Sequence, residues 1–445
     1  MKNEKNTQKH EEANKPFLYI ILALLIVAFF YVALSQLNSF FKIAIIAVTL
    51  FASGSIISKL TGDQSHYGLV ILRGTKGFNL MQKIADKHPR LCNELADLGL
   101  SLGFGSLYAY YLFNKNKTKL VLHIIALILL FGFANSNTGI PKEILILIGL
   151  LLGLSGLGII SIFQSAFKIA TVPGSPAGVM PVVPGVTVPL EAIVAIILIA
   201  VIHETAHGVL FYIEKIKLKH SGALLLGFIP IGAFVEPDEK EFDEHELNGK
   251  RRILVAGSAS NFYTFLAIMP VIAIFGVLLS GLSAGVVIQS LAPNSSASQQ
   301  LQTGQIITHI DGVEVKDTNQ LLTQLASKKP ETNVNLTLQT GENKIVTLNQ
   351  EAKMGIGAAN APIQGSGLQY TIATLLMSIL NWTALLSLAL AVINLLPLFI
   401  TDGHKLIAYE LESILKDKKK ANLITNGIGI IMVIVLIFNA LPLIK

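Results

Sequence analysis

The stretch AIILIAVIHETAHGVLFY, residues 195–212, places two histidines and a glutamate inside a run that is apolar enough to cross a bilayer. A charged side chain at that depth costs about 2.5–3.5 kcal/mol on insertion scales, so it needs a partner or a function. The rest of the chain has the same character, because 52% of its 445 residues are hydrophobic and only 14% are charged. Soluble domains carry about 25% charged residues. The composition therefore predicts a polytopic α-helical membrane protein.

The net charge and the cysteine content limit which partners we expect and which side chains could bind a metal. The net charge of +6 is ordinary for a membrane protein whose basic residues gather in cytoplasmic loops, and we expect membrane lipids and no nucleic acid as partners. The single cysteine, Cys92, excludes an internal disulfide and a cysteine-rich metal site. Any metal must therefore be held by histidine and carboxylate ligands. The sequence gives no indication of the oligomeric state.

The candidate membrane spans follow from apolar runs of about 20 residues. The polar N-terminal tail, 1–16, leads into an apolar run that we interpret as a retained anchor, with a cleaved signal as the weaker alternative. We expect about five spans in the N-terminal region 17–187. The nine candidates are 17–37, 40–57, 95–113, 120–134, 144–163, 189–213, 253–279, 368–396 and 422–442.

Lysine and arginine predict the orientation, because they accumulate on the cytoplasmic side. The loop 114–119 departs from this rule, since it carries three lysines and the span count places it outside. The segment 221–235 is apolar, too short to span, and contains Pro230, which predicts a re-entrant or hairpin element covered by other protein. The segments expected to be cytoplasmic are the tail 1–16, the loop 58–94, and the stretches 214–252 and 403–421.

The segment 283–352 alternates apolar and polar residues between Gly and Asp-Gly turns, which is typical of strands and hairpins. It predicts a small α/β domain inserted between spans, on the side opposite the cytoplasm. We interpret 353–367 as a flexible linker back to the membrane. The insertion thus divides a membrane core into the parts 188–282 and 368–421, and a last span lies within 422–445.

His203-Glu204-Thr205-Ala206-His207 is an HExxH sequence. On a helix, residues four apart lie on one face, so the two imidazoles can bind one Zn²⁺ while Glu204 acts as general base on a metal-activated water. The alternative is a pair of core histidines bonded to backbone. The cost of placing three such groups within a span favours the metal site.

Catalytic zinc commonly takes three protein ligands, and the third must come from elsewhere in the chain. The best candidate is Asp402 in NLLPLFITDGHKL, residues 394–406, where Pro397 breaks an apolar span. The alternative interpretation is that Asp402 is only a solvated residue at a helix end. His404 is a possible substitute ligand. We expect Glu191 and Asp97 to be interfacial.

These motifs together resemble the site-2 protease family of intramembrane zinc metalloproteases: HETAH in one span, a soluble insertion, and N-x-x-P-x-x-x-x-D-G in a later span. The resemblance implies one zinc per chain held by His203, His207 and Asp402, with Glu204 as general base. It also implies that Asn394 holds the substrate backbone, and that the substrates are transmembrane proteins cleaved in regulated intramembrane proteolysis.

The inserted segment resembles a PDZ domain in its strand, helix start and Ile-Asp-Gly turn, but it has Gly304-Gln305 where a Gly-Asp pair is usual. The aspartate motif departs slightly as well, because Gly403 is followed by His404 where family members often have a second glycine. The segments at 72–99 and after 231 look like archaeal and eukaryote-type members of the family.

Two other functions fit parts of the pattern. A metal transporter could use the same histidines and aspartate as a transit site, although such sites usually draw on broken helices with several exchangeable ligands. A non-catalytic scaffold could bind peptides through the inserted domain. We favour the protease, with its active site toward the cytoplasm, because His207 and Asp402 lie toward that end of their spans.

Overall fold

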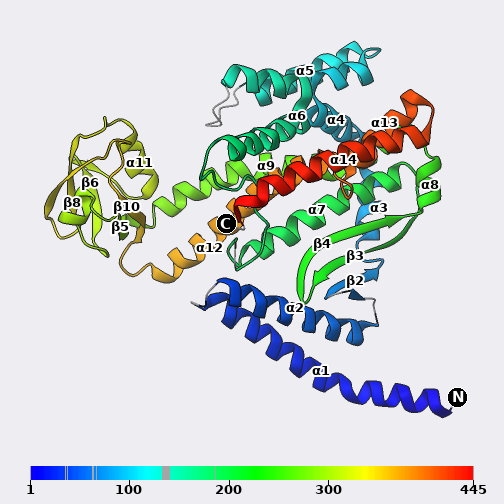
Figure 1. Ribbon diagram of the computed structural model, residues 1–445, viewed down its shortest axis with the longest axis horizontal. Helices are drawn as coiled ribbons and strands as arrows, with labels where there is room; N and C mark the ends of the chain where they lie inside the picture. The colour runs from blue at the N-terminus through cyan, green and yellow to red at the C-terminus, as the bar shows by residue number, and fades with distance from the viewer. Residues whose placement is uncertain are drawn as a thin grey trace. The chain divides into compact units, whose positions relative to one another are not determined.

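The computed structural model describes residues 2–35, 37, 39–62, 65–66, 68–132, 141–185 and 187–443. The chain forms two compact units (Figure 1). The first consists of residues 1–266 and 382–445, and the second of residues 267–381. The boundaries fall within two long helices, α9 (Leu247–Ser280) and α12 (Gly367–Leu395), so the second unit is an insertion carried on membrane-type helices.

Within the described residues, seven helices are long and apolar enough to cross a membrane. Many of their large apolar side chains are exposed, which suits a lipid environment, and the protein is an integral membrane protein of mostly helical fold. Helix α1 begins at Lys2, so most of the expected polar tail, 1–16, is part of the first helix. The seven are α1 (Lys2–Leu34), α2 (Ser39–Thr61), α6 (Lys142–Thr171), α7 (Ala192–Ile213), α9, α12 and α14 (Lys418–Ala440, followed by η1, Leu441–Leu443).

Two of the nine expected spans form helices that are not among these seven. Helix α5 (Lys117–Phe131) has 15 residues and is about 22 Å long, which is shorter than the hydrocarbon core. Helix α4 (Pro89–Phe113) is kinked at Gly105. The N-terminal region 17–187 therefore has three membrane-length helices among its described residues, where we expected about five. Residues 133–134 of the expected fourth span lie outside the described residues.

The kink in α4 packs on a second kink in α6. Gly105 and Gly153 both have positive φ, 81° and 66°. A Cβ on Gly105 would collide with the backbone of Leu151, and one on Gly153 would collide with the backbone of Leu102. The two helices are therefore in direct backbone contact, which only glycine permits at these positions.

Asp97 is buried, not interfacial as we expected, with 3% of its surface exposed. It accepts hydrogen bonds from Lys119 Nζ at 2.5 Å and from Arg252 Nε at 2.8 Å. Lys119 also pairs with Glu94 at 2.7 Å. One of the lysines that set the 114–119 loop against the orientation rule is thus neutralised by carboxylates of α4.

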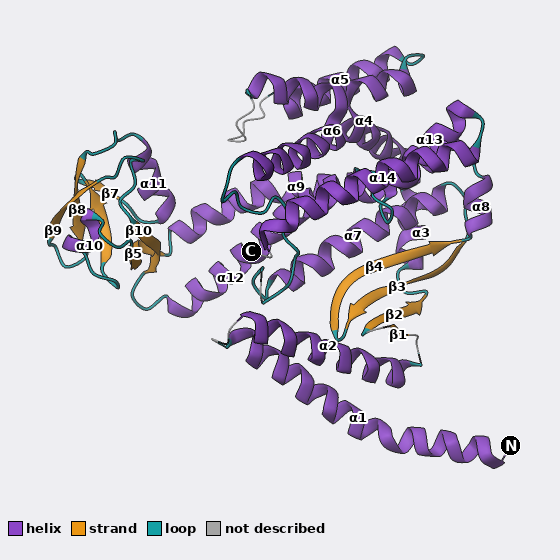
Figure 2. Ribbon diagram, in the orientation of Figure 1, coloured by secondary structure: helices purple, strands orange, loops and turns teal. Residues whose placement is uncertain are grey.

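The first unit contains a four-stranded sheet with the order β1-β2-β3-β4. The hairpin expected at 221–235 is present as β3 (Leu218–Leu226) and β4 (Ile229–Pro237), joined by a turn at Gly227, φ 62°. Strands β1 (Ser65–His66) and β2 (Leu69–Gly74) come from the loop 58–94, where we expected no strand. Strand β4 lies at the edge of this sheet, next to α7 (Figure 2).

The second unit contains a small α/β domain with a sheet of order β10-β5-β6-β8-β9, to which β7 is added beside β6. Its core is formed by side chains such as Val286, Ile307 and Leu336. The expected linker 353–367 is wrong in part, because it contains β10, which pairs with β5. The elements are β5 (Ser283–Leu291), α10 (Ser296–Gln300), β6 (Ile306–Ile310), β7 (Val313–Glu314), α11 (Thr318–Ala326), β8 (Asn333–Leu338), β9 (Asn343–Thr347) and β10 (Ile356–Pro362).

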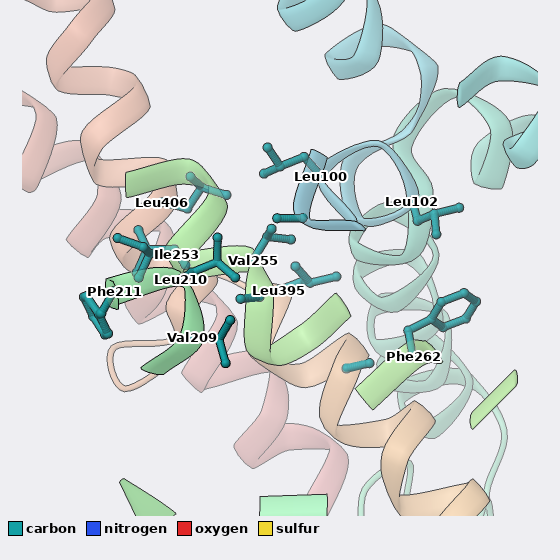
Figure 3. Close-up of a cluster of buried hydrophobic side chains, with 14 of the residues drawn as sticks. Leu100, Leu102, Val209, Leu210, Phe211, Ile253, Val255, Phe262, Leu395 and Leu406 are labelled. Atoms are coloured by element: carbon teal, nitrogen blue, oxygen red, sulfur yellow. The ribbon is translucent and has the colours of Figure 1, made fainter. Parts of the chain in front are cut away.

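The main core of the first unit gathers α4, α7, α9, α12 and α13 (Asp402–Leu415) around shared apolar contacts (Figure 3). Leu100, Leu210, Ile253, Leu395 and Leu406 supply one side chain from each of these helices, and each is at most 4% exposed. Burial of such side chains contributes about 1.5–3 kcal/mol each. This core holds together segments that are about 300 residues apart, and the short helices α3 (Phe78–Lys87) and α8 (Glu239–Glu244) contribute Met81, Ala85 and Phe242 to it.

Candidate metal centre

Helix α7 presents the two histidines of HETAH on one face. No proline or glycine interrupts the helix from Ala192 to His207, so the four-residue spacing aligns the rings. The Nε2 atoms of His203 and His207 lie 3.1 Å apart, and the two residues are 5% and 7% exposed. Two ring nitrogens at that distance are close enough to bind the same ion.

Asp402 joins this pair from the far end of the chain. It is the first residue of α13, where Thr401 caps the helix by accepting a hydrogen bond from the backbone of His404. The Asp402 Oδ2 atom lies 3.4 Å from His203 Nε2 and 3.2 Å from His207 Nε2. Tetrahedral ligands at about 2.0–2.1 Å from zinc are about 3.3 Å from one another. The three atoms therefore fit three corners of a tetrahedral site.

Hydrogen bonds on the outer side of each ring engage its Nδ1 atom, so the Nε2 atoms face Asp402. His207 Nδ1 donates to the carbonyl of Ile253 at 2.7 Å. The Asn261 amide lies 3.0 Å from His203 Nδ1, and its Oδ1 atom has no hydrogen-bond partner. Because amide O and N are assigned from the network, turning this amide over lets Oδ1 accept from His203 Nδ1–H. Such partners fix the tautomer of metal-binding histidines.

Gly257 of α9 keeps the space beside the ring nitrogens open. A Cβ on Gly257 would collide with Nε2 of both His203 and His207. Since any other residue would fill this space with side-chain atoms, the chain leaves room for an ion on that side. A donor set of two imidazoles and one carboxylate suits zinc.

Glu204 and Asn394 both lie at this cluster. Glu204 Oε2 accepts a hydrogen bond at 3.0 Å from the backbone N–H of Val235 in edge strand β4. The Asn394 side chain, in the last turn of α12, approaches His203 Nε2 with its Nδ2 atom at 3.2 Å. Both residues line the same cavity as the three candidate ligands, so the structure brings all five residues predicted from the sequence to one place.

That cavity has a volume of about 750 Å³ and a polar wall that the sequence did not indicate to us. Helix α14 contributes Lys418, Asn422 and Asn426, which are spaced by four and therefore lie on one face. Two asparagines at this spacing near the start of an otherwise apolar span were the available signal. His404 also lines the cavity but does not belong to the cluster of potential ligand atoms.

Comparisons with known proteins agree with this geometry. Residues 191–442 match the model of peptidase family M50. An uncharacterized protein of Methanocaldococcus jannaschii is 30% identical over 229 residues, which cover 51% of this chain and 56% of that protein. The chain thus spans just over half the length of the curated relative it matches. The family match covers more than half of the chain, from the start of α7 to the end of α14, and the chain belongs to peptidase family M50, the membrane metalloproteases of the site-2 protease family.

Proposed function

We propose that this protein is a zinc metallopeptidase that hydrolyses peptide bonds of transmembrane substrate proteins. The observation that carries the proposal is the cluster of His203, His207 and Asp402, whose ligand atoms all lie within 4.8 Å of one another beside Glu204. Its two histidines lie on the membrane-length helix α7, and the cluster opens on a polar cavity. A family of metallopeptidases supplies the same chemistry.

In this proposal His203, His207 and Asp402 hold one zinc ion. When bound, zinc polarises the scissile carbonyl and lowers the pKa of water. Glu204 accepts one proton from the attacking water, whose oxygen adds to the carbonyl carbon. As the C–N bond breaks, Glu204 gives this proton to the leaving nitrogen, so the glutamate is regenerated. The second proton of the water remains with the new carboxyl group.

Edge strand β4 offers a way to hold an extended substrate. Its pairing partner within the described residues is β3, so its other edge is available for strand addition. The N–H of Val235 on this strand points at Glu204, which places the edge next to the catalytic groups. Asn394, whose side chain lies beside His203 Nε2, then donates a hydrogen bond to the substrate backbone or accepts one from it. Strand addition also solves the problem that a helical substrate must unwind before its amides are accessible.

Water reaches the site through the polar cavity, whose lining of charged and amide side chains suits an aqueous opening. We place this opening toward the cytoplasm and the inserted α/β domain on the opposite side of the membrane. There the domain, which we take to be PDZ-like, would screen substrates by the size of their external portion. Deletion of 283–362 with unchanged substrate choice would instead make it a spacer.

The test compares purified wild type with Glu204→Gln and Asp402→Ala, measuring bound zinc and cleavage of a model transmembrane substrate. We expect Glu204→Gln to retain zinc and to lose about 10²–10⁴-fold in rate, because general base catalysis contributes that much. We expect Asp402→Ala to lose both zinc and activity. Wild-type cleavage by Glu204→Gln would remove the proposed base, and full zinc occupancy in Asp402→Ala would remove the proposed third ligand.

A further inference from the structure

A buried ion pair between α9 and α13 takes no part in the proposed chemistry. Arg251 Nε lies 2.5 Å from Glu410 Oε1, and Arg251 Nη2 lies 2.8 Å from Glu410 Oε2, so the pair is bidentate. Arg251 is 7% exposed. Around it, Tyr108 donates to Glu410 and Asn248 Oδ1 accepts from Arg251 Nη1 at 2.7 Å. Tyr111 also accepts a hydrogen bond from Arg251 Nη2, at 3.3 Å, so three surrounding side chains fix a single geometry for this guanidinium and carboxylate.

Stability alone is a weak reason for such a pair, because desolvation of two charges can exceed their attraction. Its place in the fold indicates another role. Arg251 is two residues before Ile253, whose carbonyl holds His207, and Glu410 is eight residues after Asp402 on α13. One turn of α9 therefore contacts both His207 of α7 and helix α13, which carries the third candidate ligand.

We propose that Arg251 and Glu410 are positioning residues, which fix the rotation of α13 against α9 and thereby aim Asp402 at His203 and His207. This rests on the proposed role of Asp402 as a metal ligand. A side chain on a helix extends about 5–6 Å from the axis, so a rotation of about 10° moves it by about 1 Å. Metal–ligand distances tolerate about 0.2 Å.

The planar fork is what resists this rotation. Two parallel N–H···O bonds fix the plane of the carboxylate, whereas a single point charge does not. Capping by Thr401 and the close approach of Gly403 to the backbone of Leu395 fix where α13 begins. The Arg251–Glu410 pair adds a second attachment about 12 Å farther along the helix.

Three variants separate geometry from charge and from folding. Arg251→Lys keeps the charge and loses the fork, Glu410→Gln keeps the size and loses the pair, and the double variant Arg251→Met with Glu410→Met removes both charges from the interior. The double variant guards against misfolding, since apolar replacement of a buried pair is often neutral or stabilising. Asp311→Asn, which removes a carboxylate paired with Lys328 at 2.6 Å in the inserted domain, is the control.

The experiment measures Zn²⁺ affinity of the full chain by chelator competition, and the visible absorption of the Co²⁺-loaded protein as a report of coordination geometry. We expect each of the three variants to bind Zn²⁺ about 10–100-fold more weakly, as is typical of outer partners of metal ligands, with an altered Co²⁺ spectrum. The control should match wild type. Wild-type affinity in the folded double variant or in Arg251→Lys would overturn the positioning role.

An Asp402→Ala arm distinguishes this failure from failure of the proposed function. If Asp402→Ala weakens Zn²⁺ binding while the Arg251 and Glu410 variants do not, the metal site stands and the positioning role falls. If wild type and Asp402→Ala bind Zn²⁺ equally, the proposed function itself falls.

Discussion

Replacing Gly257 by alanine should disable the metal centre through one methyl group. Gly257 lies on α9 opposite the paired histidines, and a Cβ there would meet Nε2 of His203 and of His207. In most helices glycine-to-alanine stabilises by about 0.8–1.0 kcal/mol, because alanine has the better helix propensity. Here the overlap with both rings opposes that gain, so the thermal midpoint should rise by less than helix propensity alone predicts, while metal binding is lost.

The size of the effect follows from the overlap. The added carbon would lie about 1 Å inside the normal contact distance of about 3.5 Å for both ring nitrogens. Either α9 or the imidazoles must move by about that amount, which is about five times the 0.2 Å tolerance of metal–ligand distances. Misplacement of catalytic groups by about 1 Å costs about 10²-fold in rate. We expect at least that loss, together with substoichiometric zinc.

The assay measures bound zinc, cleavage of a model transmembrane substrate and the thermal midpoint in detergent for Gly257→Ala and a matched control. Gly276→Ala is that control, because it is the same change on the same helix and its Cβ would meet only Met377 Cε, at an ordinary 3.5 Å. The control should retain zinc and activity. Stoichiometric zinc and wild-type cleavage in Gly257→Ala would refute the view that this glycine keeps room for the ion.

Three further predictions test other parts of the molecule. Asn394→Ala should raise KM or lower kcat while bound zinc stays stoichiometric, because Asn394 contacts His203 but is not in the candidate ligand set; loss of zinc in this variant would contradict that assignment. Val235→Pro should reduce cleavage at unchanged zinc content, because it removes the N–H group that donates a hydrogen bond to Glu204 at the edge of β4. Unchanged cleavage would show that this edge does not hold substrate. A hydrogen bond from Lys328, assisted by the backbone N–H of Asn335, lowers the pKa of Asp311. The stabilisation that the ionised Asp311 gives to the inserted domain is therefore present above the unfolded pKa of about 3.9. It is lost as the pH falls through the lower pKa of the folded state. Asp311→Asn should therefore weaken amide-exchange protection of β6 and β8 at pH 7, by about 1 kcal/mol or less. The difference in protection between variant and wild type should vanish at acid pH, after correction for intrinsic exchange rates. A difference that grows as the pH falls would reverse the assigned sign.

The histidine pair could be predicted from the sequence because its geometry is local. A spacing of four on an uninterrupted helix fixes the face on which His203 and His207 lie, whatever the rest of the chain does. Asp402 is different, since 195 residues separate it from His207. It could be selected only because the break at Pro397 ends an apolar span just before a carboxylate, and because the motif resembles a known family. Their approach to 3.2 Å depends on the packing of α9, α12 and α13, which no local pattern encodes.

Long-range pairing explains the differences as well. Strand β2 comes from a loop whose polar residues looked like a cytoplasmic connection, and it is a strand because β3 supplies its hydrogen bonds. Small residues made Ile356–Pro362 look like a linker, yet β5 pairs with it as β10. Asp97 looked interfacial because its cationic partners, Lys119 and Arg252, come from α5 and α9. In each case the deciding partner is far away in the chain.

Helix α9 shows most clearly what a span can contribute beyond crossing the membrane. From the sequence it was a candidate span with no functional residue, yet one short stretch of it contacts both histidines of the candidate site and the helix that carries Asp402. The carbonyl of Ile253 orients His207, Gly257 leaves space at both rings, and Asn261 contacts His203. Arg251 adds the attachment to the helix of Asp402. An imidazole pair in a bilayer is costly without such partners. The candidate metal site is therefore formed by α7 and α9 together, although only the HExxH motif of α7 can be recognised in the sequence.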